Sequence, residues 1–177
     1  MTRTVVAYAS AHGSTEGIAE RIAAGLRAAG HTTVMHPLAK PGDIGDFDCL
    51  VVGSAIHGGQ WLPGTEHALE NLINTSPARP VWAFSVSSIG STTSVLSTWV
   101  AHRLRPHVPE PQAVATLRAR ADVRSHRFFA GAIRPGDWPG VGRIVFRVMG
   151  GRYGDARDWD DIDQWTQQII SESIASG

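Results

Sequence analysis

The N-terminal stretch from Val5 to Thr15 constrains the fold of this chain more than any other segment. It opens with a continuous apolar run, Val5 to Tyr8, whose β-branched side chains are typical of a strand covered on both faces of a parallel sheet. Small and hydroxyl-bearing residues follow, and apolar residues then recur at helical spacing, at Ile18, Ile22 and Leu26. The stretch therefore predicts a buried strand, a tight turn and the start of an amphipathic helix.

The turn has the residues of an anion site. Its small, hydroxyl-bearing and imidazole residues are Ser10, His12, Gly13, Ser14 and Thr15. Backbone N–H groups converge at the N-terminus of a helix, where the helix dipole also favours negative charge. No lysine follows the glycine, so the turn is not a P-loop, and the glycine pattern of dinucleotide-binding loops is missing too. The turn predicts a phosphate monoester held by neutral donors, and an ordinary turn with a Ser or Thr cap is the alternative.

Further strands and helices alternate along the rest of the chain. The apolar or β-branched segments that predict strands are Thr32–Met35, Leu50–Ser54, Val81–Val86 and Phe128–Ile133. Helical patterns separate or follow them at residues 63–73, 95–104, 112–121 and 162–170. This alternation predicts the α/β class, as a doubly wound five-stranded parallel sheet of order 2-1-3-4-5 with helices on both faces. By its spacing in the second of these helices, Trp99 is expected in the core.

Two more loops rich in glycine and hydroxyl groups follow predicted strands. The loop residues that we expect to face a ligand are Ser54, Ala55, Ile56, His57, Gly58, Gly59 and Trp61 after the third strand, and Ser87, Ser88, Ile89, Gly90 and Ser91 after the fourth. In an open α/β sheet, ligands bind at the carboxyl ends of the strands, near the point where the strand order reverses. Together with the first turn, the two loops predict one shared binding site there.

The segment 134–153 exceeds what such a sheet requires. Its apolar residues at helical spacing are Val141, Ile144, Val145 and Val148, with Arg143 and Arg147 on another side. This pattern predicts an amphipathic helix, either packed on its own domain, which we favour, or lying on a membrane surface. We expect one domain over residues 1–177, with this loop and helix as an extra segment.

The composition excludes several classes of protein. The chain has 16 basic Lys and Arg residues and 16 acidic residues, so its formal net charge is zero and no general attraction to nucleic acid or to an anionic membrane is expected. No apolar run approaches membrane-spanning length, and the first strand starts too early for a secretory signal, so we expect a cytoplasmic protein. Cys49 stands alone and is expected in the core, and no metal site is predicted, because Asp158, Asp160 and Asp161 fit a helix N-terminus. The oligomeric state cannot be read from the sequence.

Several segments resemble a known family. The pattern Tyr-x-Ser-x-x-Gly-Ser-Thr, from Tyr8 to Thr15, resembles the FMN phosphate loop of the flavodoxin family. The run from Asp46 to Gly59 resembles the flavodoxin third strand and the loop after it, and is similar to the same region of quinone-dependent protoporphyrinogen oxidases. The pattern Phe-x-Gly-Ala-Ile at 129–133 and the Met-Gly-Gly at 149–151 resemble that oxidase branch and its single-domain actinobacterial relatives.

The resemblance implies a flavodoxin-like fold that binds one FMN non-covalently. The first turn would hold the phosphate, residues 57–59 would lie along the isoalloxazine with Trp61 flanking the ring, and residues 87–91 would contact the pyrimidine side. A deazaflavin is an alternative cofactor, because it shares the phosphoryl end. No aromatic residue lies between Ser85 and Thr98, where many flavodoxins stack a tyrosine, so one ring face is open or another residue such as Trp138 covers it.

The implied function is an FMN-dependent oxidoreductase that transfers electrons between an organic donor, of which a porphyrinogen is one candidate, and a quinone-like acceptor. His57 is the one candidate for proton transfer. An electron carrier without a substrate of its own is an alternative, although its neutral charge differs from the acidic surface of flavodoxins. A further alternative is a flavodoxin-like protein that has lost FMN and binds a partner.

Overall fold

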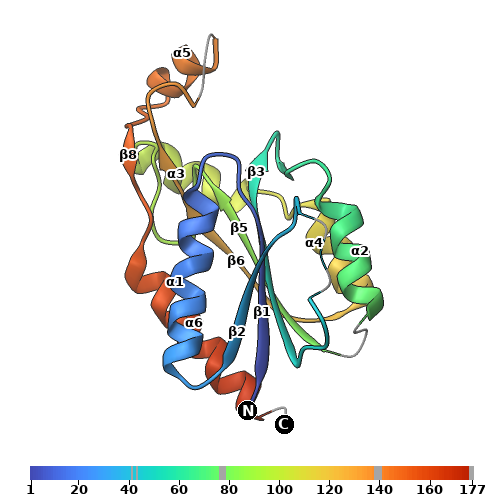
Figure 1. Ribbon diagram of the computed structural model, residues 1–177. Helices are drawn as coiled ribbons and strands as arrows, with labels where there is room; N and C mark the ends of the chain where they lie inside the picture. Colours follow the sequence, from blue (N-terminus) through green and yellow to red (C-terminus); the bar gives the residue numbers. More distant parts are fainter. Residues whose placement is uncertain (41, 43, 76–78, 138–140, 176–177) are drawn as a thin grey trace.

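A twisted parallel sheet forms the centre of the computed structural model, which describes residues 1–40, 42, 44–75, 79–137 and 141–175 (Figure 1). Its parallel strands are β1 (Arg3–Ala9), β2 (Thr32–Pro37), β3 (Cys49–His57), β5 (Pro80–Ser87) and β6 (Asp122–Ala130). They are arranged in the order β2-β1-β3-β5-β6. The short β4 (Gln60–Trp61) pairs antiparallel with the end of β3, so the parallel order matches the prediction.

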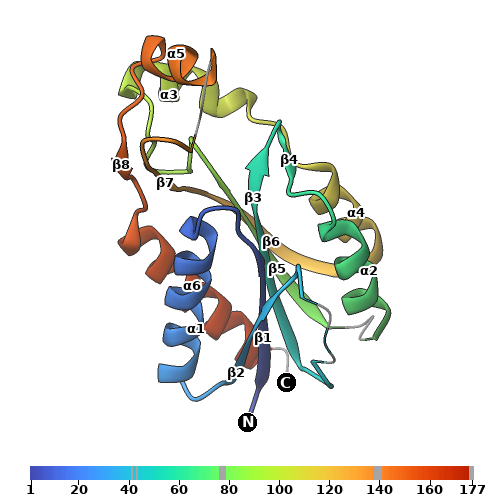
Figure 2. The ribbon, with the colours of Figure 1, turned by 45° about the horizontal axis from the view of Figure 1, so that its top comes forward.

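Helices cover both faces of the sheet (Figure 1). One face is covered by α1 (Ser14–Ala28) and α6 (Trp159–Ala175), and the other by α2 (Thr65–Thr75) and α4 (Gln112–Arg120). Two shorter helices, α3 (Thr98–Leu104) and α5 (Val141–Val148), lie beyond the carboxyl ends of the strands, and a 3-10 turn (Arg105–His107) follows α3 (Figure 2). The doubly wound α/β architecture is therefore confirmed.

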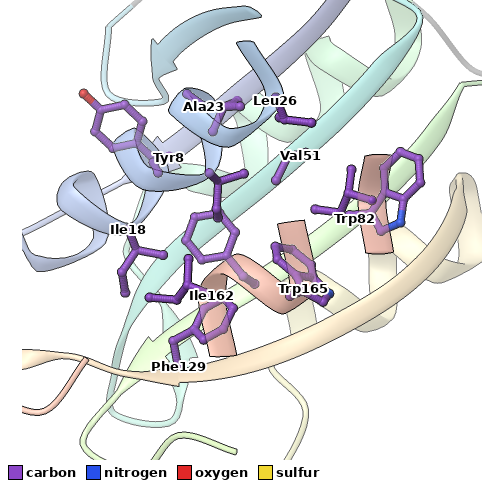
Figure 3. Close-up of a cluster of buried hydrophobic side chains, with 14 of the residues drawn as sticks. Tyr8, Ile18, Ala23, Leu26, Val51, Trp82, Phe129, Ile162 and Trp165 are labelled. Carbon is purple, nitrogen blue, oxygen red and sulfur yellow. The ribbon is translucent and has the colours of Figure 1, made fainter. Parts of the chain in front are cut away.

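The strands are continuously apolar because both of their faces are buried. Val6 and Val51 point to the side of α1 and α6, whereas their neighbours Val5 and Val52 point to the side of α2 and α4. Figure 3 shows the first cluster, in which Trp165 of α6 lies against Phe129 with ring centroids 5.6 Å apart. The predicted apolar faces of α1 and α6 are buried.

Several element boundaries differ from the prediction. The predicted strand Phe128–Ile133 is divided, because β6 ends at Ala130 and residues 132–133 belong to a second sheet. Strand β6 begins at Asp122, six residues before the predicted Phe128, because it is an edge strand whose first half carries polar residues. Helix α3 begins at Thr98 and not at Val95, and the Ser97 hydroxyl accepts a hydrogen bond from the Val100 N–H at 3.5 Å as its cap. The expectation for Trp99 was wrong: its side chain is 74% exposed, since α3 lies at the end of the sheet with one face in solvent.

The extra segment is closed at its base by a second, two-stranded sheet. Strands β7 (Ala132–Ile133) and β8 (Gly154–Asp155) pair antiparallel on either side of it. Among the residues of α5 whose side chains are described, 144–148, Phe146 is buried, while Ile144, Val145 and Val148 are exposed. The side chains of the predicted Val141 and Arg143 lie outside the described ones. The favoured expectation, that this apolar face packs on the domain, was wrong for these residues. None of the helices in the described part of the chain is long and apolar enough to cross a membrane.

Candidate functional site

Three loops meet at the carboxyl ends of the parallel strands: the turn after β1, the β3–β4 hairpin and the loop between β5 and α3 (Figure 2). They meet because β1, β3 and β5 are neighbours in a parallel sheet and so end at the same edge. The predicted loop residues are therefore brought to one region of the molecule.

The turn after β1 is held by a hydrogen bond between two of its own residues. Gly13 adopts a left-handed φ of 85°, and its N–H donates a hydrogen bond of 3.0 Å to the Ser10 hydroxyl. No heavy atom lies within 4 Å of the position that a Cβ at Gly13 would occupy. The turn therefore leaves open space directly before the first residue of α1.

Thr15 carries a polar atom that the fold leaves unsatisfied. The residue is 1% exposed, and its hydroxyl oxygen is the one buried side-chain nitrogen or oxygen atom among the described residues without a hydrogen-bond partner. Leaving a buried hydroxyl unpaired costs about 1–3 kcal/mol. It lies in the first turn of α1, where N–H groups and the helix dipole favour an anion, so a ligand oxygen there would supply the missing partner.

Residues 131–137, which run from the end of β6 into the extra segment, contact this turn. The Ser14 hydroxyl accepts a hydrogen bond of 2.8 Å from the Ala132 N–H, and a Cβ at Gly131 would approach the same hydroxyl oxygen to 2.9 Å. His12 is exposed, and its Nδ1 lies 3.8 Å from a carboxylate oxygen of Asp137. Residues 131–137 therefore pack against the turn and help to fix its position. Trp138, the predicted cover for one ring face, lies outside the described residues.

The β3–β4 hairpin turns through two glycines. Gly58 and Gly59 have φ angles of 59° and 80°, the successive left-handed conformations of a tight hairpin turn. No heavy atom lies within 4 Å of a Cβ placed on either residue. His57 precedes them and is exposed, opposite Gln60 in the hairpin. This hairpin therefore presents bare backbone and one imidazole to solvent at the carboxyl edge.

Two other predicted residues of the hairpin face inward. The buried Ser54 hydroxyl donates to the Ala55 carbonyl at 2.9 Å and accepts from the Leu62 N–H at 3.0 Å, so it shapes the loop. The Trp61 indole is 5% exposed and donates a hydrogen bond of 2.8 Å to the Ser85 hydroxyl. In this arrangement Trp61 has almost no free surface for a ring to stack on.

Next to the hairpin, a polar chain that was not predicted from the sequence runs from buried side chains to the exposed Glu110. The Ser85 hydroxyl lies 2.8 Å from Nε2 of His126, whose Nδ1 lies 3.2 Å from a carboxylate oxygen of Glu110. An indole N–H can only donate, so the hydroxyl accepts from Trp61 and is free to donate to His126. Burial lowers the pKa of His126, and the carboxylate of Glu110 opposes that shift. In the sequence, the polar Ser85 inside the apolar run of β5 was the one sign that a buried hydrogen bond is formed there.

The loop after β5 holds its shape through its own hydroxyls. The Ser87 hydroxyl donates to the Ile89 carbonyl at 2.7 Å, and the Ser91 hydroxyl donates to the Phe128 carbonyl at 3.0 Å. A Cβ at Gly90 would lie 2.3 Å from the Ala130 nitrogen, so no other residue fits there. Ile89 is buried, and Ser88 is half-buried. This loop therefore offers a ligand mainly backbone and the exposed Ser91.

The acidic residues around the start of α6 act within the fold. An oxygen of Asp158 accepts a hydrogen bond of 3.1 Å from the Asp161 N–H, and this bond is the main cause that lowers the pKa of Asp158. The buried Asp161 forms an ion pair with Arg127. Within the described ranges, no three His, Cys, Asp or Glu side chains are grouped as a metal site.

Cys49 is buried, which raises its pKa to about 11.

Solved structures share this fold at low sequence identity. The rubredoxin oxygen:oxidoreductase of Desulfovibrio gigas matches 99% of this chain with a TM-score of 0.61 and 18% identity. A flavo di-iron protein of Thermotoga maritima matches 97% of it with a TM-score of 0.60 and 18% identity. The chain spans only 37% and 36% of the length of these two proteins. A flavodoxin from the domain Archaea matches with a TM-score of 0.57 and 14% identity, over 97% of this chain and 98% of its own.

Sequence comparison adds a family to the shared fold. No curated protein sequence matches the chain. A family model described as the flavodoxin domain matches residues 5–149, which contain all three loops of the candidate site. The chain therefore belongs to the flavodoxin domain family.

Proposed function

We propose that this protein binds one FMN non-covalently at the carboxyl ends of β1, β3 and β5 and exchanges electrons with a redox partner. The observation that carries the proposal is the buried, unpartnered hydroxyl of Thr15 in the first turn of α1. A phosphate monoester at the helix N-terminus is the ligand that such a donor fits. Membership of the flavodoxin domain family supports the same cofactor.

Each loop has a role in this proposal. Ser10, His12, Gly13, Ser14 and Thr15 bind the phosphate through N–H and hydroxyl groups. The bare hairpin of Gly58 and Gly59 lets backbone approach the ring system, and residues 87–91 line its pyrimidine side. When bound, the flavin supplies the redox chemistry, whereas the protein binds it, orients it and limits its contact with water. His57, at the exposed hairpin, is the side chain placed to hold or deliver a proton.

The donor and acceptor rest on the sequence resemblance alone. An organic donor, of which a porphyrinogen is one candidate, and a quinone-like acceptor form the main hypothesis. The neutral charge of the chain favours an enzyme over an acidic shuttle that docks on basic partners. An electron carrier without its own substrate and a deazaflavin-binding protein are the alternatives.

The visible spectrum of the purified protein tests the cofactor. We expect flavin absorption bands, either as isolated or after FMN is added, and saturable binding at one FMN per chain. A colourless protein that binds no FMN contradicts the proposal, and competition by a deazaflavin at equal concentration would identify the alternative cofactor. Turnover of a donor with a soluble quinone then separates an oxidoreductase from a carrier.

A further inference from the structure

An exposed face that is both apolar and basic lies beyond the carboxyl end of the sheet. We define the α3–α5 face by its exposed apolar residues Trp99, Ile144, Val145 and Val148 and its exposed arginines Arg103, Arg147 and Arg152. Trp99 is 74% exposed, Ile144 64% and Val148 81%. The two helices adjoin, because the Ser97 N–H donates to the Met149 carbonyl at 3.5 Å and the Arg152 N–H donates to the Val95 carbonyl at 2.8 Å. Exposed apolar residues on adjoining elements mark an interaction surface more often than scattered ones do.

The fold enforces this exposure. Phe146 lies on the opposite side of α5 from Val148 and is fully buried, with its ring centroid 5.2 Å from that of Tyr153. A Cβ at Gly151 would lie 2.4 Å from the Phe146 ring, so the ring fits its site only because residue 151 is a glycine. Rotating α5 to bury Ile144 and Val148 would withdraw Phe146 from its site. The apolar face is therefore held outward.

The two segments that carry this face contain arginines and no acidic residue, and Asp155, which follows the second segment, pairs with Arg157. The chain has as many acidic as basic residues overall, yet no Asp or Glu occurs within residues 71–109 or 138–154. The ion pairs among the described residues involve none of Arg103, Arg147 and Arg152. A neutral protein thus carries a basic pole at the end where α5 projects farthest from the sheet (Figure 1).

We propose that the α3–α5 face docks on an anionic lipid bilayer. An indole at the interface, aliphatic side chains reaching into the boundary between headgroups and acyl chains, and arginines near lipid phosphates together fit this surface. A projecting helix with apolar side chains suits a deformable bilayer, whereas a protein partner would need a matching hollow. The charge is complementary to anionic lipid and not to a second copy of the same basic face.

Docking in this way has a consequence for the site. The segment that carries α5 is joined to the first turn by the Ala132 hydrogen bond to Ser14, so the face and the three loops belong to one end of the molecule. Docking brings that end to the bilayer surface. One consequence rests on the proposed function: the electron acceptor of the docked protein is a quinone dissolved in the lipid.

Sedimentation with vesicles tests the docking. The protein, with and without added FMN, is mixed with phosphatidylcholine vesicles that contain or lack phosphatidylglycerol. We expect binding to the anionic vesicles, weakened by salt, because basic residues near an anionic surface are attracted over about a Debye length. The pair Ile144→Ser and Val148→Ser should lower the partition coefficient about tenfold or more, and Arg147→Gln about fivefold.

The control is Ile174→Ser, since Ile174 is 70% exposed and belongs to the last turn of α6, whose C-terminal end lies at the opposite end of the molecule from α5 (Figure 1). It should bind vesicles as the unaltered protein does. Equal binding by the double serine variant, or no binding of the unaltered protein to anionic vesicles at low salt, would overturn the proposal. A dimer that the double serine variant abolishes would also overturn it, in favour of a second copy. Protein that binds vesicles but takes up no FMN refutes the proposed function and leaves the docking intact.

Discussion

The buried hydroxyl of Thr15 destabilises the folded chain because it lacks a hydrogen-bond partner, and this indicates that a ligand supplies one. Replacing it with valine keeps the shape and removes the unpaired hydroxyl. Without FMN, we expect Thr15→Val to raise the free energy of unfolding by about 1 kcal/mol, because a desolvated polar group is removed. With FMN, we expect affinity to fall by about fivefold to tenfold, because one hydrogen bond is lost. Urea unfolding and FMN titration measure the two effects.

The control for this variant is Thr15→Ser, which keeps a hydroxyl and should bind FMN nearly as well as the unaltered protein. A valine variant that is destabilised without FMN, or that binds FMN unchanged, would show that Thr15 serves the fold and not a ligand.

Two buried histidines predict the response to acid. Burial lowers the pKa of both His31 and His126, whose ring nitrogens contact Thr4 and Ser85. Their folded pKa values lie below the unfolded value of about 6.5, so the unfolded chain takes up protons first as the pH falls. Their contribution to stability is complete above that value and is lost towards lower pH. We expect the free energy of unfolding to decline from pH 7 to pH 5.

Chemical denaturation across this pH range is the measurement. His126→Gln and His31→Gln should each make the decline shallower, although each also lowers stability at pH 7. A slope that neither substitution changes would assign the decline to other groups.

At the scale of elements, the site loops differ in how they use glycine. Gly58 needs its left-handed φ of 59° but has open space around it, whereas Gly90 has ordinary φ and a Cβ there would meet the Ala130 nitrogen at 2.3 Å. We expect Gly58→Ala to cost about 1–2 kcal/mol of stability through backbone strain alone. Gly90→Ala should cost more, because backbone must move.

Thermal unfolding of the two variants, side by side, checks this order. The affinity of folded Gly58→Ala for FMN should also fall, since the added methyl group occupies the open space beside the hairpin. The reverse order of stability would contradict the structural account of these loops.

The helices also differ in what they stabilise. Trp165 of α6 packs edge-on against Phe84 and Phe129 in the main core, whereas Phe146 of α5 belongs to a separate small cluster. We expect Trp165→Ala to lower global stability by about 3–5 kcal/mol. Phe146→Ala should instead release α5 locally, because a satellite cluster opens without the rest of the domain.

Hydrogen exchange resolves the two outcomes. Amides of residues 141–148 should lose protection in Phe146→Ala while those of β1 and β3 keep it, and Trp165→Ala should lower protection throughout the sheet. Equal loss across the molecule in both variants would mean that α5 and the core unfold together.

At the scale of the whole molecule, ligand binding and folding are coupled. A ligand that binds only the folded chain stabilises it by about 2.7 kcal/mol at a concentration one hundred times its Kd. FMN should therefore raise the melting temperature of the protein in proportion to the logarithm of its concentration, and riboflavin, which lacks the phosphate, should do so much less. Equal shifts with both compounds would contradict a phosphate-binding turn.

The layout of the molecule was largely predictable from the sequence. The runs at Val5 to Tyr8 and at Val81 to Val86 are apolar without alternation, and that pattern is typical of strands in a parallel sheet with helices on both faces. The positions of the three loops followed, because parallel strands end at one edge. The start of β6 was missed, because an edge strand keeps polar residues that periodicity cannot distinguish from a loop.

Other features were decided by tertiary structure alone. The chain from Trp61 through Ser85 and His126 to Glu110 joins residues far apart in the sequence, and it depends on the register between β5 and β6. The exposure of Trp99 and Val148 depends on which face of a short helix has a neighbour. Local sequence determines periodicity and turns, whereas contacts between distant segments depend on how strands pair and helices dock, which no local pattern encodes.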